Sequence, residues 1–131
     1  MKIKWIEIER KNDQRGSLIV AESMKNIPFV IQRVYCLTNM SGETRGLHAH
    51  KELLQVMVCL SGTCTVTLDD GIEKQNVKLD DTKNGLLIGK MIWRSMHTFS
   101  KNCILMLLAS DWYDENDYIR DYTTFKNLVT S

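Results

Sequence analysis

Two histidines, His48 and His50, stand one residue apart in the segment from Gly42 to Lys51, which reads GETRGLHAHK. Successive side chains of a β-strand point to opposite faces, so residues two apart share a face. A neutral imidazole, with an ordinary pKa of about 6.5, can accept or release a proton near neutral pH. The pair is therefore the best candidate in the chain for proton transfer, and a hydrogen-bonded polar patch is the alternative interpretation.

Other polar side chains are spaced so that they could line one cavity together with the histidine pair. Arg33 and Tyr35 also lie two residues apart and share a face of an expected strand. A phenol at Tyr35 could donate a hydrogen bond to an oxygen of a bound molecule. The alternative is a core tyrosine whose hydroxyl bonds to the backbone. Gln55 is a neutral amide that either binds a hydroxyl or holds the histidines in place.

The elements that must position these residues are short strands. Besides the histidine segment, strand-like patterns cover residues 3–9, 17–22, 29–37, 55–60, 63–68, 72–79, 85–89, 91–99 and 103–109. The run Asp69-Asp70-Gly71 predicts a hairpin, because Asp-Gly supplies the positive φ angles of a tight turn. About nine or ten short strands at this spacing predict an all-β jelly-roll barrel or sandwich, built as one domain over residues 1–131.

The tail, residues 111–128, differs from the rest because it is dense in aromatic and acidic side chains. It could hold a short helix or two, and Asp114 is the expected helix-capping residue.

Composition narrows the class of partner. The chain has 131 residues, of which 44% are hydrophobic and 25% charged, with 17 Lys and Arg against 16 Asp and Glu. This balance does not favour nucleic acid as a partner. The four cysteines show no CxxC spacing and are typical of reduced core residues. No apolar run is long enough for a signal peptide or a membrane span, so we expect a cytoplasmic protein without a membrane partner.

The histidine segment resembles the first signature of the cupin superfamily, with Gly42 before His48 and His50, and Gln55 and Gly62 after them. That signature normally has a metal-binding glutamate where Gln55 stands, and an amide is a much poorer ligand than a carboxylate.

The second cupin signature departs further from the family pattern. Met91, Trp93 and Met96 fall where proline, glycine and a fourth ligand, histidine, would be, and His97 comes one residue late. A shift of one residue in a strand reverses the face, so His97 need not join the pair. We therefore expect no tightly bound metal and no other cofactor.

Within the superfamily the chain is most similar to the nucleotide-sugar 3,4-ketoisomerases, which act on dTDP-4-oxo-6-deoxyglucose. The resemblance covers nearly the whole chain and implies a metal-free isomerase, a homodimer with exchanged N-terminal strands, and a place in making 3-amino-3,6-dideoxyhexoses for surface glycans such as lipopolysaccharide. The motifs that carry it are Asp13-x-Arg15-Gly16-x-Leu18, Ile27-Pro28-Phe29, Arg33-Val34-Tyr35, Arg45-Gly46-x-His48-Ala49-His50-Lys51, Leu68-Asp69-Asp70-Gly71, Trp93 before Phe99, and Asp114-Glu115-x-Asp117-Tyr118-Ile119-Arg120-Asp121-Tyr122.

The resemblance also implies catalytic roles. Moving a carbonyl from C4 to C3 needs a base, an acid and a group that stabilises an oxyanion. By analogy with the family, His50 is the carbon base, His48 orients it or relays protons, and Tyr35 donates to a sugar oxygen. The resemblance places Arg15 at the substrate, and the alternative is a solvated turn residue. His97 could act as an acid for C4 if a bulge or shifted register turned it inward, and the alternative is an edge or core histidine. The presence of both residues favours the galacto-like 3-oxo product over the gluco-like one.

Five residues are candidates for substrate binding, namely Arg33, Arg45, Lys51, Gln55 and Trp93. Arginine and lysine suit a diphosphate, and Trp93 could stack on thymine. The alternatives are solvent exposure for Lys51 and packing under the barrel or at a dimer contact for Trp93.

Three other functions remain open at this point. A 3,5-epimerase of sugar nucleotides uses a similar proton abstraction but is usually longer. A cupin oxygenase would need a metal. A sugar-sensing cupin would bind without turnover, although the sequence shows no output domain such as a helix-turn-helix.

Overall fold

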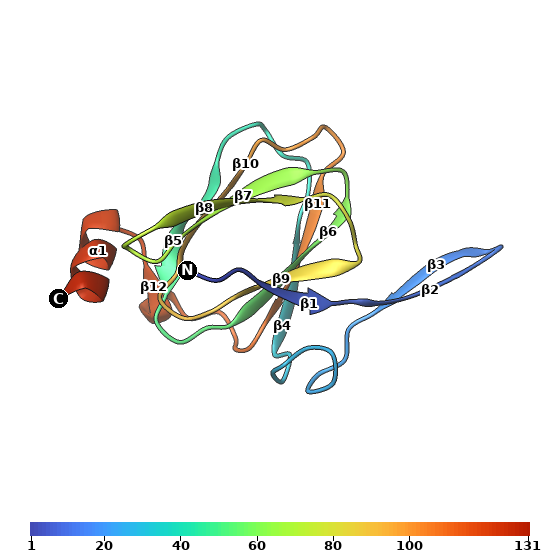
Figure 1. Cartoon of the computed structure of the whole chain (residues 1–131), viewed down its shortest axis with the longest axis horizontal. Coiled ribbons are helices and arrows are strands. Elements are labelled where there is room, and N and C mark those ends of the chain that lie inside the picture. The colour runs from blue at the N-terminus through green and yellow to red at the C-terminus, as the bar shows by residue number, and fades with distance from the viewer.

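Two five-stranded antiparallel sheets face each other in the computed structural model, which describes residues 1–131 (Figure 1). The first sheet has the order β1 (Lys4–Glu7), β9 (Asn84–Ile88), β6 (Gln55–Ser61), β11 (Ile104–Ala109) and β4 (Arg33–Leu37). The second has the order β12 (Tyr118–Ile119), β5 (Arg45–His50), β10 (Trp93–His97), β7 (Cys64–Asp69) and β8 (Lys74–Leu79). The prediction of an all-β chain is confirmed.

The core between the sheets follows from alternation along the strands. Cys64, Val66 and Leu68 of β7 are buried, as their spacing predicts, and they pack with Leu105 and Leu107 of β11. Strand β6 is apolar on both faces, and the face that points away from the second sheet is also buried, in a second hydrophobic cluster. That second cluster contains Val56, Val58 and Leu108 with two residues of the segment before β4, Ile27 and Phe29.

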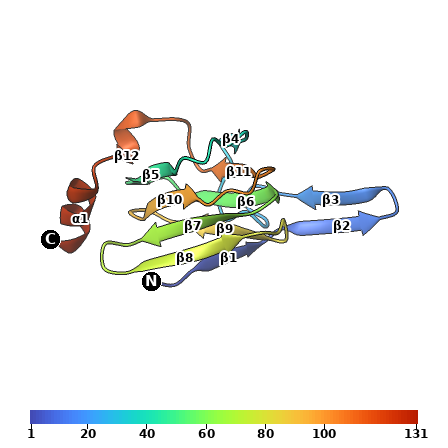
Figure 2. The ribbon, with the colours of Figure 1, turned by 90° about the horizontal axis from the view of Figure 1, so that it is seen from above.

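A long hairpin, which we call the arm, projects from the barrel (Figures 1 and 2). It consists of β2 (Glu9–Asp13) and β3 (Gly16–Val20), which pair only with each other. The first predicted strand, residues 3–9, is therefore split. The division falls at Ile8, whose side chain is buried and whose N–H donates to the carbonyl oxygen of Lys83. Arg15 lies at the tip of the arm.

The tail forms a 3₁₀ turn, η1 (Glu115–Asp117), then β12, then one helix, α1 (Tyr122–Thr130). The prediction that Asp114 caps a short helix of the tail is confirmed for η1, where its carboxylate accepts the N–H of Asn116. The helix cap is Asp121, whose carboxylate accepts the N–H of Thr124. Both η1 and β12 lie between the two caps, and β12 pairs there with β5.

Two smaller predictions can also be compared with the structure. The strand expected over residues 29–37 begins only at Arg33, because the preceding segment crosses the outer face of the first sheet. All four cysteines are free thiols, and three of them are buried. No helix is both long and apolar enough to cross a membrane.

Candidate active site

A bulge in β5 sets the direction of the two histidines. The ladder with β10 pairs His48 with Arg94 but Gly46 with Ser95, so Leu47 is the extra residue. Gly46 and Leu47 both have positive φ, +86° and +58°. A Cβ at Gly46 would lie 3.0 Å from the carbonyl oxygen of Arg94, which explains the glycine. Beyond the bulge the strand is regular, and the rings of His48 and His50 lie side by side with centroids 4.9 Å apart.

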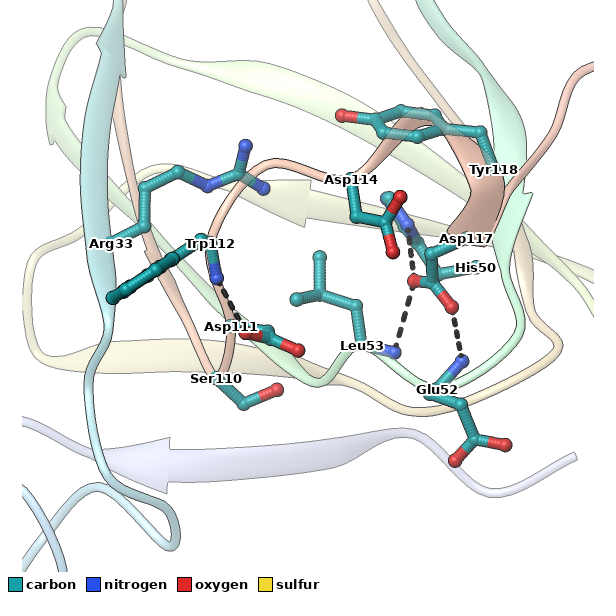
Figure 3. Close-up of a pocket in the computed structure, with 10 residues that line it drawn as sticks. All are labelled: Arg33, His50, Glu52, Leu53, Ser110, Asp111, Trp112, Asp114, Asp117 and Tyr118. Atoms are coloured by element: carbon teal, nitrogen blue, oxygen red, sulfur yellow. Dashed lines mark hydrogen bonds and ion pairs between the residues drawn. The ribbon is translucent and has the colours of Figure 1, made fainter.

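His50 is held by a carboxylate from the tail. Its Nδ1 lies 3.1 Å from Oδ2 of Asp117, and the same carboxylate accepts the backbone N–H groups of Glu52 and Leu53 (Figure 3). Since a carboxylate accepts hydrogen bonds, Nδ1 of His50 carries the hydrogen. The opposite nitrogen, Nε2, is left with its lone pair. It is buried and has no hydrogen-bond partner.

Both imidazoles are neutral at neutral pH. Burial lowers the pKa of His48 to about 4, and the positive charge of Arg94 adds to this. Burial also holds the pKa of His50 below its usual value, again reinforced by Arg94, while the carboxylate of Asp117 acts in the opposite direction. Nδ1 of His48 is buried without a partner, like Nε2 of His50. The site thus holds two neutral rings with unused nitrogens.

A hydrogen-bonded chain links the two sheets behind the histidines. Arg94, on β10, donates from Nη1 to Oε1 of Gln55, on β6. The amide nitrogen of Gln55 donates in turn to the hydroxyl oxygen of Tyr35, on β4, over 2.8 Å. Burial raises the pKa of Tyr35, so this phenol is protonated. Gln55 is thus a buried amide, as one of its two interpretations has it, but its hydrogen bonds go to Arg94 and Tyr35 and not to the histidines.

The site does not fit the metal ion of metal-binding cupins. A cation at this position would need the side-chain oxygen of residue 55, but that oxygen accepts from the guanidinium of Arg94. The guanidinium is fully buried and keeps its charge, because burial lowers its pKa only to about 10. No group of three or more His, Cys, Asp or Glu side chains is arranged to hold a metal. A second cation would be repelled here.

Two hollows adjoin the histidines, and Arg33 and Tyr118 line both. The one beside His50 has a volume of about 210 Å³ and is walled by the tail residues Asp114 and Asp117 (Figure 3). The other, beside His48, has a volume of about 380 Å³. It is lined by Arg33, Tyr35, Leu37, Arg45, Gly46, His48, Met96, Tyr113, Tyr118 and Arg120. Three arginines therefore surround this second hollow.

Four predicted site residues, described next, lie away from the two hollows. Arg15 is exposed at the tip of the arm and forms an ion pair with Asp13. Lys51 donates to the carbonyl oxygen of Asn116 and so ties β5 to the tail. Trp93 points to the outer face of its strand and packs on Tyr122 and Phe125 of α1.

His97 is the fourth of these residues. Its Nε2 lies 2.7 Å from the hydroxyl of Thr67. Arg94 and Met96 are the buried residues of β10, so His97 points away from the interior, as its one-residue displacement allows. Within one chain it is not brought to the histidine pair.

Sequence reasoning missed three residues of the site. Arg94 could have been found, because it alternates with the buried Met96 on an expected strand. Asp117 is 67 residues from His50, and no spacing rule links them. Tyr118, whose ring centroid lies 4.4 Å from that of His50, is placed by the same long-range pairing of β12 with β5.

Comparison with known proteins shows the family of this chain and several relatives that match nearly its whole length. Residues 1–130 match the FdtA family model, described as WxcM-like, C-terminal. A TDP-4-oxo-6-deoxy-alpha-D-glucose-3,4-oxoisomerase from Aneurinibacillus thermoaerophilus is 51% identical over 98% of this chain and 94% of its own. A 3,4-ketoisomerase from Helicobacter canadensis superposes with a TM-score of 0.95 at 45% identity, over 100% of this chain and 99% of the other.

Another solved structure records a ligand. QdtA, a sugar 3,4-ketoisomerase from Thermoanaerobacterium thermosaccharolyticum, was crystallised with TDP and has a TM-score of 0.94 at 39% identity, over 97% of this chain and 93% of the other. A histidine-to-asparagine mutant of QdtA was crystallised with TDP-4-keto-6-deoxyglucose. The 4-keto-6-deoxy sugar epimerase NovW of Streptomyces spheroides shares the fold alone, with a TM-score of 0.73 at 17% identity.

These matches confirm the jelly-roll fold and the resemblance on which the expectations were based. The relatives that match over nearly the full chain are isomerases. The chain belongs to the FdtA family, described as WxcM-like, C-terminal.

Proposed function

We propose that this protein is a dTDP-sugar 3,4-ketoisomerase that converts dTDP-4-oxo-6-deoxyglucose into a dTDP-3-oxo-6-deoxyhexose. The observation that carries the proposal is the buried, unpartnered Nε2 of His50, held as a base by Asp117. The relatives named for this reaction match almost the whole chain, which supports the same substrate here.

In the proposed mechanism Nε2 of His50 removes the proton from C3 of the sugar. The C3–H electron pair becomes the C3–C4 double bond of an enediolate, and the C4 carbonyl oxygen takes the negative charge. Tyr35 donates its hydroxyl hydrogen to that oxygen, since its own oxygen already accepts from Gln55. The C3 hydroxyl proton then passes to the C4 oxygen and a proton returns to C4, which leaves a carbonyl at C3 and a hydroxyl at C4. The product is an isomer, so no oxidant or reductant is required.

His48 completes the proton path in this proposal. Its ring contacts that of His50 edge to face, and its Nδ1 is free to hold a proton or a sugar hydroxyl. Because His48 stays neutral until the pH falls to about 4, it can relay a proton without adding a permanent charge beside Arg94.

The diphosphate is proposed to bind the arginines around the hollow beside His48. Arg33, Arg45 and Arg120 line it, and fork-shaped guanidinium groups suit phosphate oxygens. Arg120 is at present paired with Glu115 and stacked over Tyr118, 4.1 Å from the ring centroid. A diphosphate would compete with Glu115 for this guanidinium.

We further propose a homodimer in which the arm of each chain lies on its partner. A lone two-stranded hairpin is marginally stable in water, and here residues 9–18 are exposed, including Leu18 with 59% of its surface. A second copy that covers the arm would bury this apolar residue. Arg15 at the tip would then act at the partner's site rather than its own.

For the C4 configuration we propose the galacto-like product. The chain carries both Arg15 and His97, on which this expectation is based, and a partner's arm would bring the basic Arg15 to the sugar. His97 could assist only across such an interface, because in its own chain it faces outward.

Product identification tests the function directly. The purified protein is incubated with dTDP-4-oxo-6-deoxyglucose, and the sugar is followed by NMR. A carbonyl at C3 with an axial hydroxyl at C4 is the expected product, and an equatorial hydroxyl would contradict only the galacto-like assignment. Exchange at C5 with the carbonyl still at C4 would instead identify an epimerase.

A further inference from the structure

Arg94 is a buried cation without a carboxylate partner. Only 1% of the residue is exposed, and all its hydrogen bonds go to neutral oxygens. Nη1 donates to Gln55, while Nε and Nη2 donate to the carbonyl oxygen of Ile92 over 3.2 and 2.9 Å. Burying a charge without a counter-charge is unfavourable, even after the surrounding protein has relaxed around it. A packing role alone would be filled better by an apolar side chain.

The guanidinium fixes the direction of the chain of hydrogen bonds. Arginine can only donate, so the side-chain oxygen of Gln55 must face Arg94 and its NH₂ must face Tyr35. The hydroxyl oxygen of Tyr35 is thereby an acceptor, and its hydrogen is left for another group. Tyr35 lines the hollow beside His48, so this hydrogen is available to a molecule that binds there.

The same cation lies next to the histidines. Arg94 is the residue opposite His48 in the β5–β10 ladder. His48 is also faced by Arg120 and Glu115, and His50 by His48, Arg33, Arg120 and Asp117. Arg94 is the only one of these neighbours that is fully buried and bonded to the residue at the cupin ligand position, Gln55.

We propose that Arg94 is the fixed cation of this site and takes the place of the cupin metal ion: it holds Gln55 so that Tyr35 must donate to the substrate oxygen that becomes negative, and its charge stabilises that oxygen. This inference rests on the proposed function. Arg94 is a positioning residue, because it acts through Gln55 and Tyr35. The counter-charge that the buried guanidinium lacks is supplied, on this account, by the enediolate.

The test compares Arg94→Met, Tyr35→Phe and the double variant. Removal of one preorganised group that stabilises an oxyanion typically lowers kcat by about 10²–10³-fold, and we expect a loss of this size for Arg94→Met with little change in KM. Because Arg94 acts in part through Tyr35, the loss in the double variant should be clearly smaller than the product of the two single losses. Losses that multiply would contradict the proposal.

Gln55→Glu provides a second test if Arg94→Met does not fold. The new carboxylate keeps the shape of the amide and forms an ion pair with Arg94, so the cation is neutralised in place. We expect a loss of kcat comparable to that of Arg94→Met, and no bound metal after incubation with Zn²⁺ or Mn²⁺. Wild-type kcat, or one equivalent of tightly bound metal, would overturn the proposal. Gln32→Glu is the matched control, because Gln32 is exposed and outside the site.

A readout without substrate separates this inference from the proposed function. Titration of the histidine rings by NMR should show the pKa of His48 rising by about one unit or more in Arg94→Met and Gln55→Glu, since a nearby positive charge is removed or neutralised. An unchanged pKa would overturn the role of Arg94 even in an active enzyme. If the wild-type protein did not isomerise the sugar, the proposed function would fail while this titration still tested the charge.

Discussion

Oδ2 of Asp117 lies 3.1 Å from Nδ1 of His50, and both groups are largely buried, with 16% and 2% of their side chains exposed. The carboxylate comes from the tail and the imidazole from β5, and β12 brings them together by pairing Tyr118 with His50. The contact decides which nitrogen of His50 is basic. It also makes the tail a part of the site, because the hydrogen-bond partner of Nδ1 comes from the tail and not from a barrel strand.

Asp117→Asn should therefore lower kcat strongly while the nucleotide still binds. An amide can donate to Nδ1, which would move the hydrogen of His50 to Nε2 and remove the base. Loss of the carboxylate of the His–Asp pair in a serine protease lowers kcat by about 10⁴-fold. We expect the loss here to be at least about 10²-fold. Steady-state kinetics and calorimetric binding of dTDP measure the two quantities. Asp80→Asn, in an exposed loop, is the control.

Stability should fall as the pH is lowered below about 6.5, where histidines of the unfolded chain take up protons. In the folded protein the pKa of His48 is lowered to about 4 and that of His50 is also below its usual value, so the unfolded state binds more protons in this window. Each ring contributes at most ~1.4 kcal/mol per pH unit. Urea unfolding between pH 7.5 and 5 measures this, and His48→Asn should show a shallower decline. An equal decline in the variant would mean that His48 does not contribute to the pH dependence of stability.

The arm can be tested by complementation between subunits. Arg15→Ala and His50→Asn chains are co-expressed with different affinity tags, and the mixed dimers are isolated. If Arg15 acts at the partner's site, each mixed dimer contains one intact site and should have about half the wild-type activity, in line with the expectation for exchanged elements. If Arg15 acts in its own chain or not at all, the mixed dimers should recover no activity beyond that of the Arg15→Ala parent.

Trp93 should matter for stability and not for binding thymine. Its ring packs on Tyr122 and Phe125 at centroid distances of 5.2 and 5.7 Å, on the outer face of β10. Trp93→Leu should lower the free energy of unfolding by ~1–3 kcal/mol, as is usual for loss of packed area. The KM for the dTDP-sugar should not change. A raised KM with unchanged stability would instead place Trp93 at the nucleotide.

Sequence patterns predicted the parts of this molecule that depend on local spacing. Alternation did not predict β2 or β12 as separate strands. It located most of the other strands and the inward face of β7, and the one-residue gap placed His48 and His50 on one side. These features depend only on a period of two along a strand.

Features that depend on distant parts of the chain could not be read from spacing. Asp117 meets His50 only because the tail adds a strand to the edge of β5. Arg94 meets Gln55 only because β10 and β6 belong to facing sheets. Asp114 caps η1 as predicted, but the second cap, Asp121, was not identified, because its place at the start of α1 follows from the pairing of β12 with β5.

Removal of the C3 hydrogen of the sugar tests the central claim most directly, namely that His50 takes that proton. The reaction of dTDP-4-oxo-6-deoxyglucose is run in D₂O with the wild-type protein or with His50→Asn, and NMR follows the C3 hydrogen of the substrate and deuterium at C4 of the product. We expect rapid loss of the C3 hydrogen with deuterium at C4 for the wild type, and neither above background for His50→Asn although the variant still binds dTDP. Loss of the C3 hydrogen at the wild-type rate in His50→Asn would contradict the account.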